Sequence, residues 1–104
     1  MNKFHNRKKN GFDSVKEFNR YRDLMLLQKA GKISGLSRQI RFDLLPPQYD
    51  GDKCVLRGCY YVADFTYWEN GNFIVEDCKG YKTPDYVIKK KLMYYFHNIL
   101  IKET

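Results

Sequence analysis

The chain has 104 residues, enough for one small domain and too few for two. Its 19 Lys and Arg against 12 Asp and Glu give a net charge of +7, which favours a polyanionic partner, nucleic acid before membrane. No apolar run approaches the roughly 18 residues of a transmembrane helix, and no apolar stretch follows the basic start as in a signal peptide. A basic surface that only keeps the protein soluble is the plainer interpretation of the charge.

The three cysteines, Cys54, Cys59 and Cys78, are odd in number and lack the CxxC spacing of metal sites. Free thiols in a reducing cytosol fit this pattern best. We therefore expect a soluble, cytoplasmic protein.

Residues 1–11 are polar and basic, and we predict a flexible arm there, suited to lying on a phosphate backbone. A terminus that is merely disordered is an equally good interpretation. From Asp13-Ser14 the sequence predicts a helix that runs to about Ala30, with Gly31 as the C-terminal stop.

Glu17 has two interpretations at this stage. Ser14 and Glu17 have the spacing of a capping box, which would make the carboxylate a purely structural group. Glu17 also heads a row with Tyr21 and Leu24 on one helix face, which would aim its carboxylate toward a sheet. The sequence leaves both roles open.

A strand is predicted from Leu36 to Leu45 because apolar and polar residues alternate there. One side carries Ile40, Phe42 and Leu44, and the other carries Gln39, Arg41 and Asp43. Pro46-Pro47 ends the strand, and a loop through Asp50-Gly51-Asp52 is expected to follow.

The central feature is a hairpin around Asn70-Gly71, flanked by runs rich in β-branched and aromatic residues. Such a pair favours a type I′ turn, because both central residues then have φ > 0. Glu69 then pairs with Asn72, and further along the strands Asp64 lies opposite Asp77. A four-residue loop gives the same pairing, whereas a three-residue loop would put the two carboxylates on opposite faces.

In the first register, Asp64, Asp77 and Lys79 share one face, while Glu76 and Cys78 point the other way. Like charges placed directly opposite each other destabilise a sheet, and one lysine offsets only part of the repulsion. A divalent cation with oxygen ligands is the obvious candidate to offset the rest.

Thr83-Pro84-Asp85 predicts the start of a second helix, which ends at His97-Asn98. We expect Ile88, Leu92, Tyr95 and Phe96 to form its buried stripe and Lys89, Lys90 and Lys91 to be mostly exposed. Such a run of charge is usually a solvated face, and contact with phosphates is the second interpretation. Residues 99–102 complete the order α-β-β-β-α-β as a short strand.

Asp64, followed by Asp77-Cys78-Lys79, with Glu17 on a preceding helix, resembles the pattern of the PD-(D/E)XK nuclease superfamily. The chain departs from it at Ala63, where the superfamily name has Pro, and at Asp77, where many members have Glu. More closely, five stretches resemble a family of small phage-encoded proteins placed in this superfamily and likened to Holliday-junction resolvases. These stretches are FDSVKEFNRYRDL, LLQKAGKISGL, YVADFTY, VEDCKGYKT and IKKKL, spread over nearly the whole chain.

The resemblance implies a single α/β (α+β) domain over residues 12–104, with an αβββαβ restriction-endonuclease-like core and a mixed sheet flanked by helices. It implies a metal-dependent DNA endonuclease active in recombination, repair or replication. Asp64, Asp77 and the Cys78 backbone carbonyl would hold Mg²⁺ or Mn²⁺, and Glu17 would reach the ion through water or hold a second one. Lys79 would orient or help deprotonate the attacking water.

The expected partner is DNA, branched DNA included, in the cytoplasm of a bacterial or phage-infected cell. Five side chains are expected to contact it: Gln39, Arg41, Lys82, Lys89 and Lys90. A symmetric homodimer is a reasonable assembly for so small a domain, and no membrane partner is expected. The alternative is a non-catalytic basic module that binds nucleic acid, in which Asp64, Asp77 and Lys79 form structural ion pairs.

Overall fold

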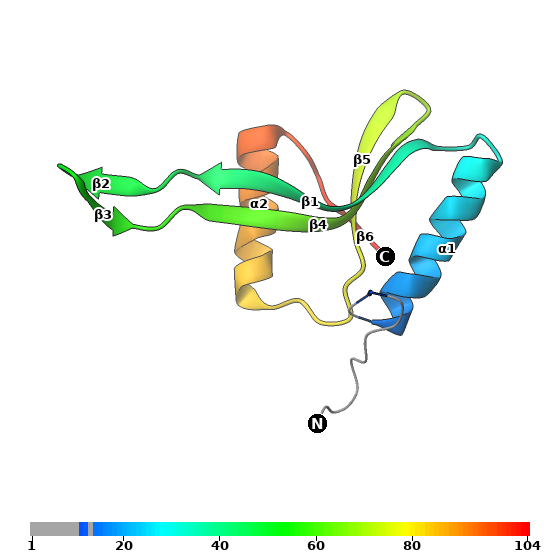
Figure 1. Cartoon of the computed structure of the whole chain (residues 1–104), viewed down its shortest axis with the longest axis horizontal. Coiled ribbons are helices and arrows are strands. Elements are labelled where there is room, and N and C mark those ends of the chain that lie inside the picture. The colour runs from blue at the N-terminus through cyan, green and yellow to red at the C-terminus, as the bar shows by residue number, and fades with distance from the viewer. Residues whose placement is uncertain (1–10, 13) are drawn as a thin grey trace.

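The computed structural model describes residues 11–12 and 14–104, so the arm predicted for residues 1–11 lies almost wholly outside the described part. Figure 1 shows the arrangement of the helices and strands. In chain order they are α1 (Val15–Lys29), β1 (Ser34–Leu45), β2 (Gln48–Asp50), β3 (Lys53–Leu56), β4 (Cys59–Glu69), β5 (Asn72–Asp77), α2 (Pro84–His97) and β6 (Lys102–Glu103).

Four of these strands form one sheet in the order β1-β4-β5-β6. The first two pairings are antiparallel, and β6 joins β5 in parallel, so the sheet is mixed. The predicted mixed α+β domain, with two helices against a mixed sheet, is confirmed. The last strand was predicted at residues 99–102, but only Lys102 and Glu103 reach β5, while Ile101 is buried in the core.

The predicted hairpin is confirmed, and so is its register. Glu69 pairs with Asn72, and the pairing continues as far as Phe65 with Glu76. The turn residues Asn70 and Gly71 have φ of 52° and 79°, as the type I′ turn requires. The next position along this register sets Asp64 against Asp77.

The loop expected through Asp50-Gly51-Asp52 is wrong. The chain there forms a two-stranded antiparallel ribbon, in which Asp50 pairs with Lys53 across a turn containing Gly51. Strands of three and four residues are too short to show an alternating pattern, which is why the sequence did not predict them. Figure 1 shows this ribbon projecting beyond α2, on the side away from α1.

The ends of α2 agree with the prediction. Thr83 caps its start by accepting a hydrogen bond from the Tyr86 N–H at 3.3 Å, and Asn98 ends it in the left-handed region with φ of 55°. The predicted buried stripe is largely wrong, because Ile88 and Tyr95 are 57% and 80% exposed. Phe96 is also exposed, and only Leu92 is partly buried.

The residues of α2 that are buried are Tyr86 and Met93, two helical turns apart. The helix is rotated from the expected orientation because its polar groups are bound on the sheet side. Tyr86 and Lys90 both donate to the Glu103 carboxylate, at 2.7 and 3.1 Å. Lys89 and Lys90 are accordingly half-buried and not mostly exposed, whereas Lys91 is exposed as expected.

The core has two clusters of buried residues, one under each helix. The α2 cluster contains Leu44, Tyr61, Ala63, Val75, Tyr86, Met93 and Ile101. The α1 cluster contains Phe12, Leu24, Ile33, Phe65 and Tyr67. Strand β4 contributes to both, and Asp64 is the residue at which it passes from one cluster to the other.

Strand β1 has an irregular conformation beside the same point. Gln39 falls between the pairs Arg38–Phe65 and Ile40–Ala63, which places it next to Asp64. Its φ is 54°, in the left-handed region that few residues other than glycine adopt within a strand. Backbone of this kind gathers at functional sites. In the described part of the chain, neither helix is long and apolar enough to cross a membrane.

Candidate functional site

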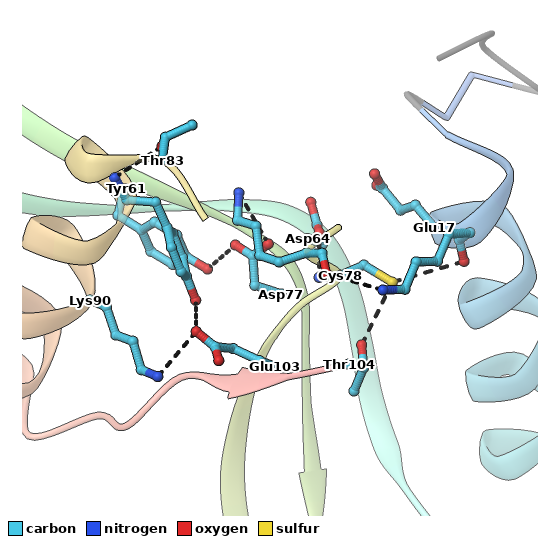
Figure 2. A network of polar contacts seen from close by, with 12 residues as sticks. Glu17, Tyr61, Asp64, Asp77, Cys78, Thr83, Lys90, Glu103 and Thr104 are labelled. Carbon is cyan, nitrogen blue, oxygen red and sulfur yellow. Dashed lines mark hydrogen bonds and ion pairs between the residues drawn. The ribbon is translucent and has the colours of Figure 1, made fainter. Parts of the chain in front are cut away.

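The two carboxylates of the hairpin lie at the centre of a polar network between α1 and α2. Figure 2 shows Asp64 and Asp77 with Glu17 on one side and Tyr61 and Glu103 on the other. Asp77, at the end of β5, is 2% exposed, and Asp64 in the middle of β4 is half-buried. The structure thus brings together the two acidic residues predicted from the register.

Asp64 is held by the backbone of the following motif. The Cys78 N–H donates to its Oδ2 at 2.8 Å. The pKa of Asp64 is raised to about 7, first by burial and then by the negative charges of Asp77 and Glu17, against the lowering effect of that hydrogen bond. The carboxylate is therefore placed where its charged form is poorly stabilised by the protein alone.

Asp77 is bound unequally through its two oxygens. Tyr61 Oη donates to Oδ2, and burial together with this bond raises the pKa of Tyr61, so that the phenol stays a neutral donor. Lys79 Nζ lies 3.4 Å from Oδ1 as an ion pair. No regular hydrogen bond from the described residues reaches this buried Oδ1.

Lys79 is itself positioned by its surroundings. Its ammonium lies 4.5 Å from the centroid of the Tyr86 ring, a cation–π distance. Its backbone N–H donates to the Thr104 carbonyl at 3.3 Å, and its carbonyl accepts from Lys16 Nζ at 3.1 Å. These contacts tie the segment after β5 to both β6 and α1.

Glu17 combines features of both of its predicted roles. Its backbone N–H donates to Ser14 Oγ at 3.1 Å, so the Ser14 half of the capping box is confirmed. Its side chain is only 5% exposed and accepts a hydrogen bond from Gln39 Nε2 at 3.1 Å. The carboxylate is therefore turned toward the sheet, near enough to Asp64 to raise the pKa of that residue.

A cleft of about 460 Å³ opens at these residues, and it is lined by Ser14, Lys16, Glu17, Asp64, Cys78, Lys79, Gly80 and Tyr81. It lies between the start of α1 and the segment that follows β5. Asp64, Glu17 and Lys79 face this cleft directly, whereas the more deeply buried Asp77 is absent from the lining.

Among the described residues, no three His, Cys, Asp or Glu side chains converge closely enough to form a ready metal site. The pair Asp64 and Asp77 still fits a hard divalent cation. Both offer carboxylate oxygens, which Mg²⁺ prefers, and Asp77 Oδ1 is buried without a regular donor. Asp64 and Asp77 would hold the ion, with the Cys78 carbonyl and Glu17 as the further ligands expected from the sequence.

Glu76, the neighbour of Asp77, provides a contrast that the sequence did not reveal. Its fully buried carboxylate accepts from Arg20 Nε at 2.5 Å, from Tyr67 Oη at 2.6 Å and from Thr104 Oγ1 at 3.1 Å. Burial raises the pKa of Glu76, but these partners outweigh it and lower the pKa overall. Glu76 is thus a satisfied structural group.

The five side chains predicted to contact DNA fall into three groups. Gln39 binds Glu17, while Lys82 and Lys90 both pair with Glu103, at 3.0 and 3.1 Å. Arg41 and Lys89 lie over the exposed Tyr60 ring, 4.1 and 5.9 Å from its centroid. Arg41 also pairs with Asp43 at 3.0 Å.

Sequence reasoning missed Tyr61, Tyr86 and Glu103, which hold Asp77, Lys79 and Lys90. No spacing in the sequence relates these residues to the motif, since their proximity depends on how α2 and β6 pack. The three cysteines are free, as predicted.

Fold and site together define a small single-domain α+β protein with a cleft lined by carboxylates and lysine at the end of its central hairpin. Residues 2–102 match the model of a family described as "Protein of unknown function (DUF1064)". Because this match spans nearly the whole chain, the protein belongs to that family. Neither the curated proteins nor the solved structures contain a match to the chain.

Proposed function

We propose that this protein is a metal-dependent endonuclease that hydrolyses phosphodiester bonds in DNA. One observation carries the proposal: half-buried Asp64 faces buried Asp77, whose Oδ1 has no hydrogen-bond donor among the described residues, while the adjacent Glu76 is fully compensated. Buried charge is costly unless it is compensated, and a bound cation would complete the partial compensation that Tyr61, Lys79 and the Cys78 N–H give this pair. The resemblance of the motif to the PD-(D/E)XK superfamily points to the same chemistry.

Mg²⁺ or Mn²⁺, when bound, would neutralise the phosphoryl oxygens and make hydroxide available near neutral pH. Asp64 and Asp77 would hold that ion, with Tyr61 fixing the orientation of Asp77. Lys79 lines the cleft and would stabilise the negative charge that develops during hydrolysis. Glu17, which accepts a hydrogen bond from Gln39, would position the attacking water or accept a proton from it.

A DNA substrate is supported by the net charge of +7 and by the cationic groups around the cleft. Lys16 lines the cleft beside Lys79. Such a surface attracts phosphate groups most strongly, and this attraction does not depend on the base sequence of the DNA.

The ion pair between Lys79 and Asp77 favours the alternative, a module that binds nucleic acid without cleaving it. A metal titration separates the two. A nuclease site binds Mn²⁺ and loses this binding in Asp77→Ala, whereas an ion-paired module shows neither effect. Asp43→Ala is the matched control, because Asp43 is an exposed carboxylate on the same sheet, and it should bind Mn²⁺ like the unaltered protein.

Activity is tested directly by incubating the protein with a labelled four-way junction, a duplex and a single strand, with and without Mg²⁺. We expect metal-dependent cleavage of at least one substrate, abolished in Asp64→Ala, Asp77→Ala and Lys79→Ala, with DNA binding largely retained. Binding of DNA without cleavage under any metal condition would overturn the proposal in favour of the module.

A further inference from the structure

Tyr60 of β4 is an exposed aromatic residue accompanied by two cations. It is 45% exposed, the Arg41 guanidinium lies 4.1 Å from the centroid of its ring, and the Lys89 ammonium lies 5.9 Å from the same point. Asp43 accepts a hydrogen bond from Arg41 Nε at 3.0 Å, which helps to keep the guanidinium over the ring. We call Tyr60, Arg41 and Lys89 the Tyr60 platform. Its ring and its cations are thus held together by contacts within the chain.

The Tyr60 platform points away from the core. The neighbouring residues Tyr61 and Phe42 pack in the α2 cluster, and successive residues of a strand point to opposite sides of a sheet. Tyr60 and Arg41 therefore lie on the opposite side, where the Arg41 side chain is 63% exposed. Val62, which pairs with Arg41, is exposed as well, so this part of the sheet surface is open to a ligand.

A pocket of about 460 Å³ adjoins the ring, at the point where the register of β1 and β4 shifts. Its walls include Tyr60, Arg41, Pro46, Pro47 and Gly58. A Cβ atom on Gly58 would lie 3.0 Å from the Leu45 carbonyl oxygen and 3.2 Å from Pro47 Cδ, so a glycine is needed for this close approach. Tight packing and two rigid proline rings therefore fix the shape of the pocket, which leaves room for a planar group beside Tyr60.

An exposed aromatic ring with cations beside it is the combination with which proteins bind unpaired nucleotides, because the base stacks on the ring and the cations attract the phosphates. In a continuous duplex the bases are stacked on one another, and only the phosphates are then available to such a group. We propose that the Tyr60 platform binds an unpaired nucleotide of a DNA strand, with the base stacked on Tyr60 and the adjoining phosphates on Arg41 and Lys89. Such a site rests on the proposed function in that DNA is its partner, but it requires no catalysis.

The Tyr60 platform also lies close to the proposed metal site along the chain. Tyr60 and Asp64 are four residues apart in β4, which puts their Cα atoms about 13 Å apart at about 3.3 Å per residue. A base on Tyr60 is then only a few nucleotides from a phosphate bound at the cleft. The substrate class is therefore DNA with unpaired nucleotides next to the position of cleavage, as in a single strand, a flap or a branched junction.

The first test compares the affinity for single-stranded and duplex DNA of the same length, measured by fluorescence anisotropy in chelator so that no strand is cleaved. Tyr60→Leu keeps an apolar side chain but removes the ring. We expect it to raise the Kd for the single strand by about tenfold, as for the loss of one stacked base, and to leave the Kd for the duplex unchanged. Tyr60→Phe keeps the ring and should bind both DNAs like the unaltered protein.

Tyr95→Leu is the matched control, because Tyr95 is an exposed tyrosine of α2, and this change should alter neither Kd. If Tyr60→Leu does not weaken binding to the single strand, or weakens binding to the duplex equally, the platform is refuted, whereas DNA cleavage would still support the endonuclease. A loss confined to the single strand in a protein that cleaves no DNA would support the platform and refute the endonuclease. A protein that binds neither form of DNA would overturn both.

The second test locates the bound base by photochemical cross-linking. Single strands that carry one 5-iodouracil, each at a different position, are irradiated in complex with the protein, and the linked peptide is fragmented in a mass spectrometer. We expect a link at Tyr60 from at least one position, and none at residue 60 in Tyr60→Leu. The other exposed tyrosines are internal controls: Tyr49, Tyr81, Tyr94 and Tyr95. Absence of a link at Tyr60, with or without links at these residues, would overturn the proposal.

Discussion

Glu76 and Asp77 are consecutive buried acids with opposite surroundings. Glu76 is bound by a guanidinium, a phenol and a hydroxyl, which together compensate its charge. Asp77 has one phenol and a lysine at 3.4 Å, and it faces the carboxylate of Asp64. The difference assigns a structural role to Glu76 and supports the proposal that Asp77 is the acid that binds a metal ion.

Asp77→Asn tests this assignment without a substrate. The change removes the charge that opposes Asp64, so it should stabilise the metal-free protein by roughly 0.2–1 kcal/mol, the range for opposed pairs. It should also abolish the rise in melting temperature that Mn²⁺ causes in the unaltered protein, because a ligand stabilises only the state it binds. Thermal denaturation with Mn²⁺ and with chelator measures both. Destabilisation in chelator, together with an unaltered protein that ignores Mn²⁺, would contradict the metal site.

Glu76→Gln should have the opposite effects on stability and on the response to Mn²⁺. Loss of the carboxylate removes charged hydrogen bonds from Arg20, at a cost of about 2 kcal/mol in the free energy of unfolding. The shift with Mn²⁺ should persist, because Glu76 points away from the metal ligands. Urea denaturation with and without Mn²⁺ gives both quantities. A variant of normal stability that fails to bind Mn²⁺ would place Glu76 in the site.

Asp64 should also be visible in the pH dependence of stability. Burial raises its pKa from the ordinary 3.8 to about 7, so between these values the folded state binds more protons than the unfolded state. The contribution of Asp64 to the free energy of unfolding therefore falls as pH rises from about 4 to about 7. Asp64→Asn should remove this decline. The free energy of unfolding of both proteins is measured in chelator across this pH range, and the difference between them isolates the contribution of Asp64. A difference that does not change with pH would exclude this contribution.

At the scale of the elements, α1 brings Glu17 to the sheet while its first turn is capped by Ser14. The two functions are separable because the cap uses the backbone N–H of Glu17 and the cleft receives its carboxylate. Gln39 reaches that carboxylate from a strand position with φ of 54°. Helix α1 and strand β1 thus meet at the Glu17 side chain.

Glu17→Gln should lower the rate of cleavage by about 10–100-fold, the usual cost of losing a group that supports a metal site. The melting temperature should stay unchanged, because the cap uses the backbone N–H of residue 17, which the substitution keeps. Ser14→Ala is the paired control. It should cost about 1 kcal/mol of stability through the lost cap and retain cleavage. Normal cleavage by Glu17→Gln would leave Glu17 as a cap alone.

The sequence predicted those features that depend on neighbouring residues. Asn70-Gly71 determined the hairpin and its register, and Ser14 and Thr83 marked the helix starts. It could not predict which side of α2 is buried, because Glu103 at the far end of the chain binds Tyr86 and Lys90. The contact of Tyr61 with Asp77 was hidden for the same reason, since it depends on packing between distant segments.

At the scale of the whole molecule, the net charge of +7 overstates the cations available to DNA. Lys82 and Lys90 are both bound to Glu103. The hydrogen bond from the Tyr86 hydroxyl, and to a smaller extent these two lysines, lower the pKa of that carboxyl to about 2. Arg20 is likewise bound to Glu76. Arg41 and Lys89 differ, because they lie over the exposed Tyr60 ring at the surface, and the one carboxylate that Arg41 pairs with, Asp43, is itself exposed to solvent.

Two double variants with the same change of charge use this difference. Arg41→Gln/Lys89→Gln should lower the slope of log K for DNA against log[salt] by about 2, because two phosphate contacts and their released counterions are lost. Lys82→Gln/Lys90→Gln should change the slope less, since both lysines already neutralise Glu103, and should instead reduce stability. Binding to a labelled duplex at several salt concentrations measures both slopes. Equal slopes for the two variants would show that net charge alone governs binding, and no change in either would place DNA on another face.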